Sequence, residues 1–123
     1  MKTYRVAQVG LGPRGRTHVD GFTHNADRFE LAAVCDLDEG RLRQAVSEYG
    51  IAKAYTDADR MLAEIQPDVF CFVTQPHVRL SMVELCVRHG IQALAFEKPM
   101  ATSLREAWAI ADLCQRHGIK AIV

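Results

Sequence analysis

Short apolar runs alternate with segments of helical period along the whole chain, and this alternation leaves few folds open. Six runs have strand character, and most of them are almost entirely apolar, as expected of strands covered on both faces. They are Arg5 to Val9, Glu30 to Cys35, Lys53 to Tyr55, Val69 to Val73, Ala93 to Phe96, and Lys120 to Val123. Strands that alternate with helices form a parallel sheet with helices on both faces. The sequence therefore predicts one three-layer α/β domain over residues 1–123.

Three of the intervening segments contain apolar residues at positions i, i+3, i+4 and i+7, the spacing of a helix with one buried face. Their apolar residues are Leu42, Ala45, Val46 and Tyr49; Ala58, Met61, Leu62 and Ile65; and Leu104, Ala107, Trp108 and Ala111. We expect each of these sets to form the buried side of its helix.

Composition and charge exclude several classes of function. Fifteen basic residues balance fifteen acidic ones, so no net charge draws the chain to nucleic acid or to an anionic membrane. The amino terminus has no secretory signal pattern, and no apolar run approaches transmembrane length. The four cysteines lack the close pairing of zinc sites or redox motifs, which indicates reduced core residues and no metal site. These features predict a cytoplasmic protein that binds neither nucleic acid nor membrane.

A glycine-rich turn follows the first predicted strand. The segment Gly10-Leu11-Gly12-Pro13-Arg14-Gly15 fits the pattern G-x-G-x-x-G and precedes a helix that we expect to begin near Arg16. In a dinucleotide site the first glycine permits the tight turn, the second lets the backbone approach a pyrophosphate, and the third allows close packing. The phosphates then meet free amide groups and the positive end of the helix dipole. A plain glycine-rich turn is the alternative, and Arg14 would face either the pyrophosphate or solvent.

An acidic residue closes the second predicted strand. Asp36 lies 21 positions after Gly15, where a carboxylate accepts hydrogen bonds from the adenosine ribose of a dinucleotide. Capping of the next helix is its alternative role, for which Asp38 is better placed. A carboxylate here repels a 2′-phosphate and so favours NAD, although Arg41 and Arg43 keep NADP open as a cofactor.

The segment Glu97-Lys98-Pro99 follows the fifth predicted strand and should emerge at the carboxyl edge of the sheet. Ligands of open α/β sheets bind at that edge. An ammonium group there can hydrogen-bond a substrate hydroxyl, and partial desolvation would suit it to proton transfer. An ion pair on the surface is the alternative.

These motifs together resemble the amino-terminal domain of the glucose-fructose oxidoreductase, inositol dehydrogenase and rhizopine-catabolism (Gfo/Idh/MocA) family. The similarity comprises Val6 to Gly10, Asp36, Asp68 to Thr74, and Phe96 to Ala101, and it extends over essentially the whole chain. Of these, the Glu-Lys-Pro segment is more specific than the glycine loop.

The resemblance implies roles for individual residues. It places Lys98 near the nicotinamide and the substrate, gives Glu97 a part in organising the cofactor pocket, and implies a cis peptide bond before Pro99. The loop Thr74-Gln75-Pro76-His77 resembles the family's segment beside the cofactor riboses. This chain departs from the family there, because members usually have Thr-Pro in place of Thr74-Gln75 and commonly a histidine at the position of Arg79. We expect His18 to pack within the first helix.

The predicted fold is a doubly wound Rossmann sheet with strand order 3-2-1-4-5-6, because the glycine loop must lie at the switch point between the first and fourth strands. The predicted ligand is NAD, bound by Gly10, Gly12, Pro13, Arg14, Gly15, Asp36, Thr74, Gln75, Pro76, Glu97 and Lys98. The parent reaction would be hydride transfer between nicotinamide and a hydroxyl-bearing carbon of a sugar, cyclitol or related polyol, with Lys98 as the catalytic residue.

Two alternatives stay open. One is a non-catalytic dinucleotide-binding sensor or partner-binding module, against which the presence of Lys98 argues. The other is a Rossmann-like methyltransferase. The family also has a second, carboxyl-terminal domain that holds the substrate pocket and the main oligomer interface, and these residues do not include it. We therefore expect the chain alone to bind cofactor with little or no turnover, and a homo-oligomer remains open.

Overall fold

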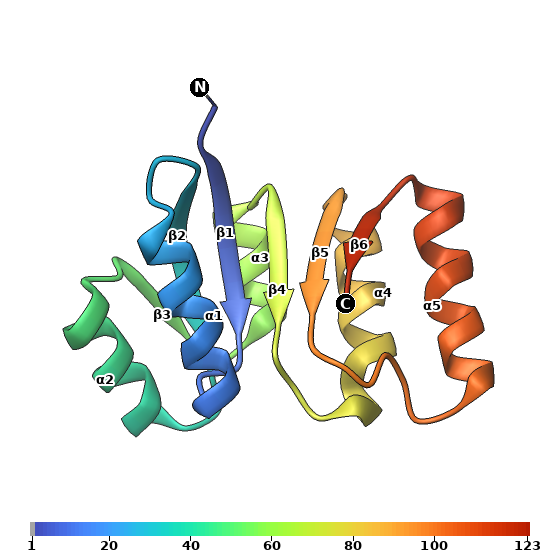
Figure 1. Ribbon diagram of the computed structural model, residues 1–123, viewed down its shortest axis with the longest axis horizontal. Coiled ribbons are helices and arrows are strands. Elements are labelled where there is room, and N and C mark those ends of the chain that lie inside the picture. Colours follow the sequence, from blue (N-terminus) through green and yellow to red (C-terminus); the bar gives the residue numbers. More distant parts are fainter. Residues whose placement is uncertain (1) are drawn as a thin grey trace.

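Six parallel strands form one sheet in the computed structural model, which describes residues 2–123 (Figure 1). The strand order is β3-β2-β1-β4-β5-β6, which confirms the predicted topology. The strand bounds lie within one residue of the predicted ones. They are β1 (Tyr4–Val9), β2 (Phe29–Cys35), β3 (Lys53–Tyr55), β4 (Val69–Phe72), β5 (Ala93–Phe96) and β6 (Lys120–Ile122).

Five α-helices and one short 3-10 helix connect these strands within the described residues. They are α1 (Pro13–His24), α2 (Glu39–Tyr49), α3 (Ala58–Ile65), η1 (Pro76–Val78), α4 (Arg79–Arg88) and α5 (Leu104–His117). Helix α1 begins at Pro13 and not near Arg16 as expected, because a proline fits the first turn of a helix, where its missing N–H would be unpaired in any case. No helix in residues 2–123 has the length and apolar character needed to span a membrane.

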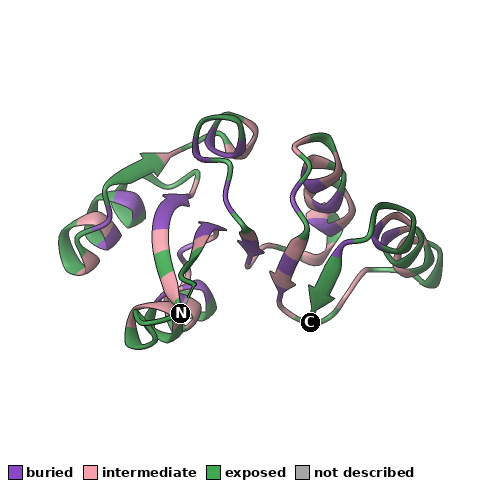
Figure 2. Ribbon diagram, turned by 90° about the horizontal axis from the view of Figure 1, so that it is seen from above, coloured by how far each residue is buried: buried purple, intermediate pink, exposed green. Residues whose placement is uncertain are grey.

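The core is divided between the two faces of the sheet (Figure 2). On one face, α1 and α2 pack on the sheet through a smaller cluster, and on the other face α3, α4 and α5 pack through a larger one. The smaller cluster comprises Leu11, Val19, Val34, Leu42, Ala45 and Ile51. The larger one includes Met61, Leu62, Phe70, Phe72, Val83, Cys86, Leu94, Phe96, Ile110 and Cys114. The sequence predicted burial on both faces for most of the strands. The central strands β1 and β4 are mostly buried, whereas the edge strands β3 and β6 are largely exposed.

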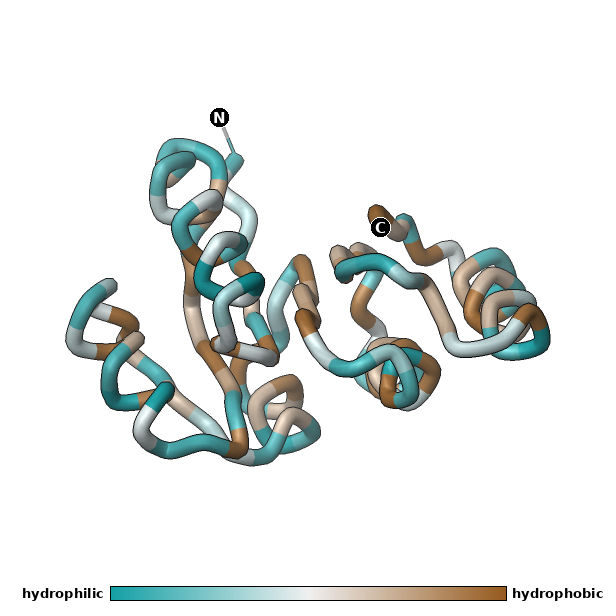
Figure 3. Tube along the Cα trace, turned by 60° about the horizontal axis from the view of Figure 1, so that its bottom comes forward, coloured by the Kyte–Doolittle hydropathy of each residue, from teal (hydrophilic) through white to brown (hydrophobic). Residues whose placement is uncertain are grey.

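The predicted buried face of α5 is wrong. Leu104 and Trp108 are 75% and 68% exposed, whereas Ile110 and Cys114 pack in the core. Hydrophobic and hydrophilic segments alternate along this helix (Figure 3). Two sets of its apolar residues satisfy the helical spacing, so the sequence alone does not decide between them. The corresponding predictions for α2 and α3 are confirmed, since their sets are buried or half-buried.

The sheet has its switch point between β1 and β4. These two strands pair side by side from Val6 with Val69 to Val9 with Phe72, but the chain leaves them toward opposite edges of the sheet. The loops after β1, β2, β4 and β5 therefore gather at one edge (Figure 1), where doubly wound folds bind their ligands.

Candidate functional site

Two glycines of the loop after β1 are required by the protein's own backbone. Gly10 has φ +98°, and a Cβ built on it would lie 2.1 Å from the carbonyl oxygen of Val73. A Cβ on Gly15 would lie 2.1 Å from the carbonyl oxygen of Gly10. Neither position tolerates a side chain without backbone movement, so the tight turn and the close helix contact predicted for this motif are both present.

Gly12 differs from the other two. It caps the start of α1 with φ −69° and ψ −173°, values that any residue can adopt. The nearest atom to a Cβ built on it is Nη1 of Arg41, at 3.7 Å. No acidic residue occupies the first turn of α1, so its positive end is not neutralised locally. The helix start is therefore open to an anionic group.

A buried glutamine in β1 binds the backbone of the glycine loop. Gln8 lies in the middle of β1, is fully buried, and donates from Nε2 to the carbonyls of Gly10 (3.0 Å) and Gly15 (2.7 Å). These bonds hold the two ends of the glycine loop together. Sequence reasoning missed this residue, although a single polar residue within an apolar strand is a signal that could have identified it.

Asp36 fastens the glycine loop to the end of β2. Its Oδ2 accepts a hydrogen bond from the backbone of Leu11 at 2.8 Å, and its Oδ1 accepts one from Asp38 at 2.9 Å. A carboxylate oxygen can accept two hydrogen bonds, so both retain capacity for a ligand. The neighbouring Leu37 is 88% exposed and adds an apolar surface beside this carboxylate, which the sequence analysis did not anticipate.

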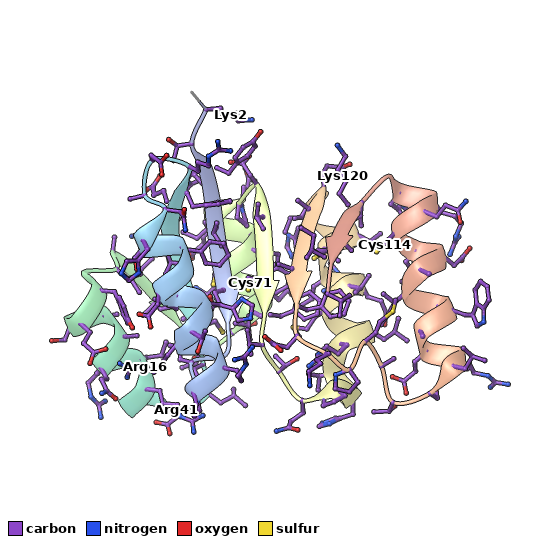
Figure 4. The ribbon with its side chains drawn as sticks, in the orientation of Figure 1. Lys2, Arg16, Arg41, Cys71, Cys114 and Lys120 are labelled. Carbon is purple, nitrogen blue, oxygen red and sulfur yellow. The ribbon has the colours of Figure 1, made fainter. Side chains whose placement is uncertain are left out.

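The start of α2 brings an arginine to the glycine loop. Asp38 caps this helix by accepting from the backbone N–H groups of Gly40 and Arg41, which confirms it as the better cap. The Arg41 guanidinium lies near Gly12, 3.9 Å from the nearer carboxylate oxygen of Asp38. Figure 4 shows Arg41 and Arg16 at the end of α1 and α2 where the strands also end. Arg41 pairs with Asp38 and Arg16 pairs with Glu48, so this edge of the sheet carries charges of both signs.

Glu97 joins the segment after β5 to α1. Its Oε1 accepts from Nε2 of His18 at 2.8 Å and from Nη2 of Arg14 at 2.9 Å. Hydrogen bonds from His18 and Arg14 hold the pKa of the Glu97 carboxyl below its ordinary value. His18 lies in α1 as expected, and its ring also reaches Glu97. The sequence carries no local signal for that contact, because the two residues are 79 positions apart.

Lys98 is exposed and forms no ion pair within residues 2–123. The surface pair with Glu97 that was its alternative role is absent from the described chain. The bond between Lys98 and Pro99 is cis, which confirms that expectation. Lys98 lines a cavity of about 350 Å³ together with His18, Phe96, Glu97 and Ile122, among others. Its ammonium group is thus available to a ligand.

The loop after β4 is held by a buried arginine. Arg79 donates to the carbonyls of Thr74, Glu97 and Pro99, and this residue was not among the predicted site residues. The Thr74 hydroxyl is buried and has no hydrogen-bond partner in residues 2–123. Gln75 is exposed and precedes the short helix η1.

Other features of the described chain carry no chemistry of this kind. Burial raises the pKa of the Cys35 and Cys71 thiols to about 12 and also raises those of Cys86 and Cys114, so all four stay protonated as core residues. Residues 2–123 contain no cluster of three side chains able to hold a metal ion. A larger cavity of about 600 Å³ lies between α2, β3 and α3. None of the predicted site residues lines it. We therefore define the site by the loops that hold the predicted residues and not by the size of a cavity.

The structure therefore brings together the glycine loop, Asp36, the loop after β4 and the Glu-Lys-Pro segment at one edge of the sheet. The open N-terminus of α1 suits a pyrophosphate and the carboxylate after β2 suits a ribose. The residues present thus fit a dinucleotide, and fold and site define the class of dinucleotide-binding Rossmann domains.

Comparison with known proteins agrees with this class. The family model described as "Oxidoreductase family, NAD-binding Rossmann fold" matches residues 4–123. The D-apiose dehydrogenase of Paraburkholderia graminis is 34% identical over 110 residues, which are 89% of this chain and 29% of that protein. The 4-hydroxy-tetrahydrodipicolinate reductase of Geobacillus kaustophilus is 38% identical over 95 residues, and the match covers 73% of this chain and 35% of that protein. The WlbA dehydrogenase of Chromobacterium violaceum, solved in complex with NADH and UDP-GlcNAcA, has a TM-score of 0.92 at 27% identity and covers 100% of this chain and 35% of that one.

The chain belongs to the Gfo/Idh/MocA oxidoreductase family and is an NAD-binding Rossmann domain of that family. The resemblance seen in the sequence is thereby confirmed. The chain spans about a third of the length of the relatives it matches.

Proposed function

We propose that this chain binds NAD along the carboxyl edge of its sheet, with the pyrophosphate over Gly12 at the start of α1. The observation that carries this proposal is the contrast among the three glycines. Gly10 and Gly15 are glycines because backbone atoms occupy the Cβ position, whereas no backbone atom lies near that position at Gly12. Gly12 instead leaves space in front of the helix N-terminus, where a phosphate would meet the backbone amide groups. Pro13 and Arg14 complete this part of the site.

The adenosine half would lie against the end of β2. Asp36 would accept hydrogen bonds from the ribose hydroxyls with the lone pairs that Leu11 and Asp38 leave free. The exposed side chain of Leu37 would pack against the adenine ring. Arg41 lies close enough to the loop to meet a 2′-phosphate, so NADP remains a second cofactor in this proposal.

The nicotinamide half would lie between the loops after β4 and β5. The loop Thr74-Gln75-Pro76 and Glu97 would flank the nicotinamide riboside, and the unpaired ammonium of Lys98 would face the substrate. Bound nicotinamide supplies the hydride chemistry. Lys98 would orient the substrate hydroxyl and exchange its proton.

The activity that we propose for the whole protein is oxidation and reduction of a hydroxyl-bearing carbon in a sugar, cyclitol or related polyol. Similarity to a D-apiose dehydrogenase and to a dehydrogenase solved with UDP-GlcNAcA supports a sugar-like substrate. The similarity to a 4-hydroxy-tetrahydrodipicolinate reductase lies in the same part of the chain, so these residues do not select the substrate. We expect the 123-residue chain to bind cofactor with little or no turnover.

We also infer the cellular location and the partners of the protein. We infer a cytoplasmic protein, because its four thiols are reduced core residues and reduced cysteines are typical of that compartment. Its partners would be the dinucleotide and a small-molecule substrate, and neither nucleic acid nor membrane. Self-association into a homo-oligomer stays a prediction for sedimentation analysis.

Calorimetric titration of the chain with NAD, NADP and S-adenosylmethionine tests the proposal. We expect NAD to bind and Gly12→Val to weaken its binding by at least about tenfold. Asp36→Ala should also weaken the binding of NAD and should reduce the preference for NAD over NADP. Gly21→Ala is the control, because it changes a glycine inside the helix that Gly12 caps, and nothing lies within 4 Å of the new methyl group. Binding of S-adenosylmethionine in place of NAD, or NAD binding that is indifferent to Gly12→Val, would contradict the proposal.

A further inference from the structure

We propose that Arg79 is a positioning residue that fixes Lys98 and joins the two loops on the nicotinamide side of the site. This inference rests on the proposed role of Lys98 and goes beyond it, because it assigns the positioning of that lysine, which lies in the loop after β5, to a residue of α4.

Arg79 is the first residue of α4 and is only 2% exposed. Its Nη1 donates to the backbone carbonyls of both Glu97 and Pro99, and its Nη2 donates to the carbonyl of Thr74 at 2.9 Å. The first two carbonyls belong to the residues on either side of Lys98. One guanidinium therefore holds the chain before and after the lysine and connects it to the loop after β4.

The direction of the Lys98 side chain depends on this backbone. Its ammonium group makes no ion pair in residues 2–123, and no hydrogen bond of its side chain is present there, so no polar contact of its own fixes its direction. Two carbonyls bound to a single nitrogen restrict the orientation of the peptide groups around Lys98, and hence the path along which its side chain leaves the loop. Substrate and cofactor groups must be held within a few tenths of an ångström for efficient reaction.

Packing alone does not account for an arginine here. The guanidinium is buried, and no carboxylate lies within ion-pair distance of it in the described chain. Burying an unpaired charge is unfavourable. Three carbonyl oxygens and the ring of Phe96, whose centroid lies 5.7 Å away, offset that cost. An apolar side chain could fill the same space but could not bind the carbonyls, so the donor groups are the feature that the site uses.

Two ligands separate a positioning role from a general structural one. ADP-ribose has the pyrophosphate and both riboses but lacks the nicotinamide, so it reports on the glycine loop and Asp36, whereas NADH reports on both halves. Arg79→Met removes the donors, and Arg79→Lys keeps the charge and one donor group. Arg88→Met is the matched control, because Arg88 ends the same helix and pairs with Asp59 on the surface.

The affinity of the 123-residue chain for each ligand is measured by calorimetry. We expect Arg79→Met to weaken the binding of NADH by about tenfold and the binding of ADP-ribose by less than about twofold. Arg79→Lys should recover part of the affinity for NADH. Arg88→Met should change neither affinity. The NADH-induced shift of the Lys98 ε-methylene NMR signal should also be lost in Arg79→Met. If Arg79 only stabilised the core, Arg79→Met would weaken the binding of both ligands equally.

The outcomes distinguish the two proposals. If the unmodified chain binds neither ligand, the proposed function fails. If it binds both, and Arg79→Met weakens both equally or neither, the positioning role is overturned. If Arg79→Met does not fold, the ratio of the two affinities in Arg79→Lys decides. Failure of the lysine variant to fold as well would assign Arg79 to the core and overturn the inference.

Discussion

Replacing the third glycine of the loop by alanine should destabilise the domain far more than the same change nearby on α1. A Cβ at Gly15 would lie 2.1 Å from the Gly10 carbonyl oxygen, well inside the 3.4 Å at which ordinary contact begins. That carbonyl cannot easily retreat, because the Gly10 N–H is bound to Cys35 at 2.9 Å and the Gly10 carbonyl itself to Gln8 at 3.0 Å. The clash must be relieved by moving α1 or the end of β1.

The magnitude follows from two opposing effects. Forcing an additional methyl group into a packed site costs about 1–3 kcal/mol, and more where backbone must move. Alanine in a helix gains about 1 kcal/mol over glycine. We therefore expect Gly15→Ala to lower the free energy of unfolding by about 2 kcal/mol, whereas Gly21→Ala, with open space around it, should raise it by about 1 kcal/mol. Gly12→Ala at the helix cap should change it by less than about 1 kcal/mol.

Urea denaturation followed by circular dichroism measures all three variants. The difference between Gly15→Ala and Gly21→Ala should be about 3 kcal/mol, which is a shift in melting temperature of roughly 10 °C for a domain of this size. If Gly15→Ala is as stable as Gly21→Ala, the close packing of α1 on β1 is not as described, and the argument that isolates Gly12 as the ligand-facing glycine is refuted.

Three further predictions concern charge and exposure. The lowered pKa of Glu97 means that its carboxylate stabilises the folded state above its ordinary pKa of 4.5 and that this contribution disappears as pH falls through the lowered value. Glu97→Gln should therefore be less stable than the unmodified chain at neutral pH, and the difference in unfolding free energy should vanish in acid; a pH-independent difference would rule out this origin. Arg41→Ala should weaken NADP more than NAD in calorimetry, and equal weakening by the exposed Arg43→Ala would show that only net charge matters. The fluorescence of Trp108, the single tryptophan, should have the emission of a hydrated indole and be quenched by acrylamide, and a protected, blue-shifted emission would show that this face of α5 is covered.

The parts of the fold that the sequence predicted are those with local signals. The nearly apolar strands and the glycine loop define their own conformations, and the position of Gly10 at the switch point then sets the strand order. Asp38 is another such case, because a cap binds backbone N–H groups only two and three residues further along the chain. These predictions needed no knowledge of which segments meet in space.

The parts that the sequence did not predict depend on long-range contacts. His18 and Glu97 are 79 residues apart, and Arg79 meets carbonyls 18 and 20 positions away. Nothing in the local sequence distinguishes such an arginine from an exposed one. The face of α5 was misjudged for a related reason. Trp108 and Ile110 belong to two different sets with helical spacing, and packing against the rest of the core, helix α4 included, selects between them.

Mapping of NADH on the chain by amide chemical shifts would examine the location of the site in a single titration. The proposed site predicts that the signals of Gly12, Asp36, Thr74 and Lys98 shift together with one dissociation constant, while those around the larger cavity between α2, β3 and α3 stay in place. Signal shifts confined to the residues that line that cavity, or an unchanged spectrum at millimolar NADH, would contradict the assignment of the carboxyl edge of the sheet as a dinucleotide site.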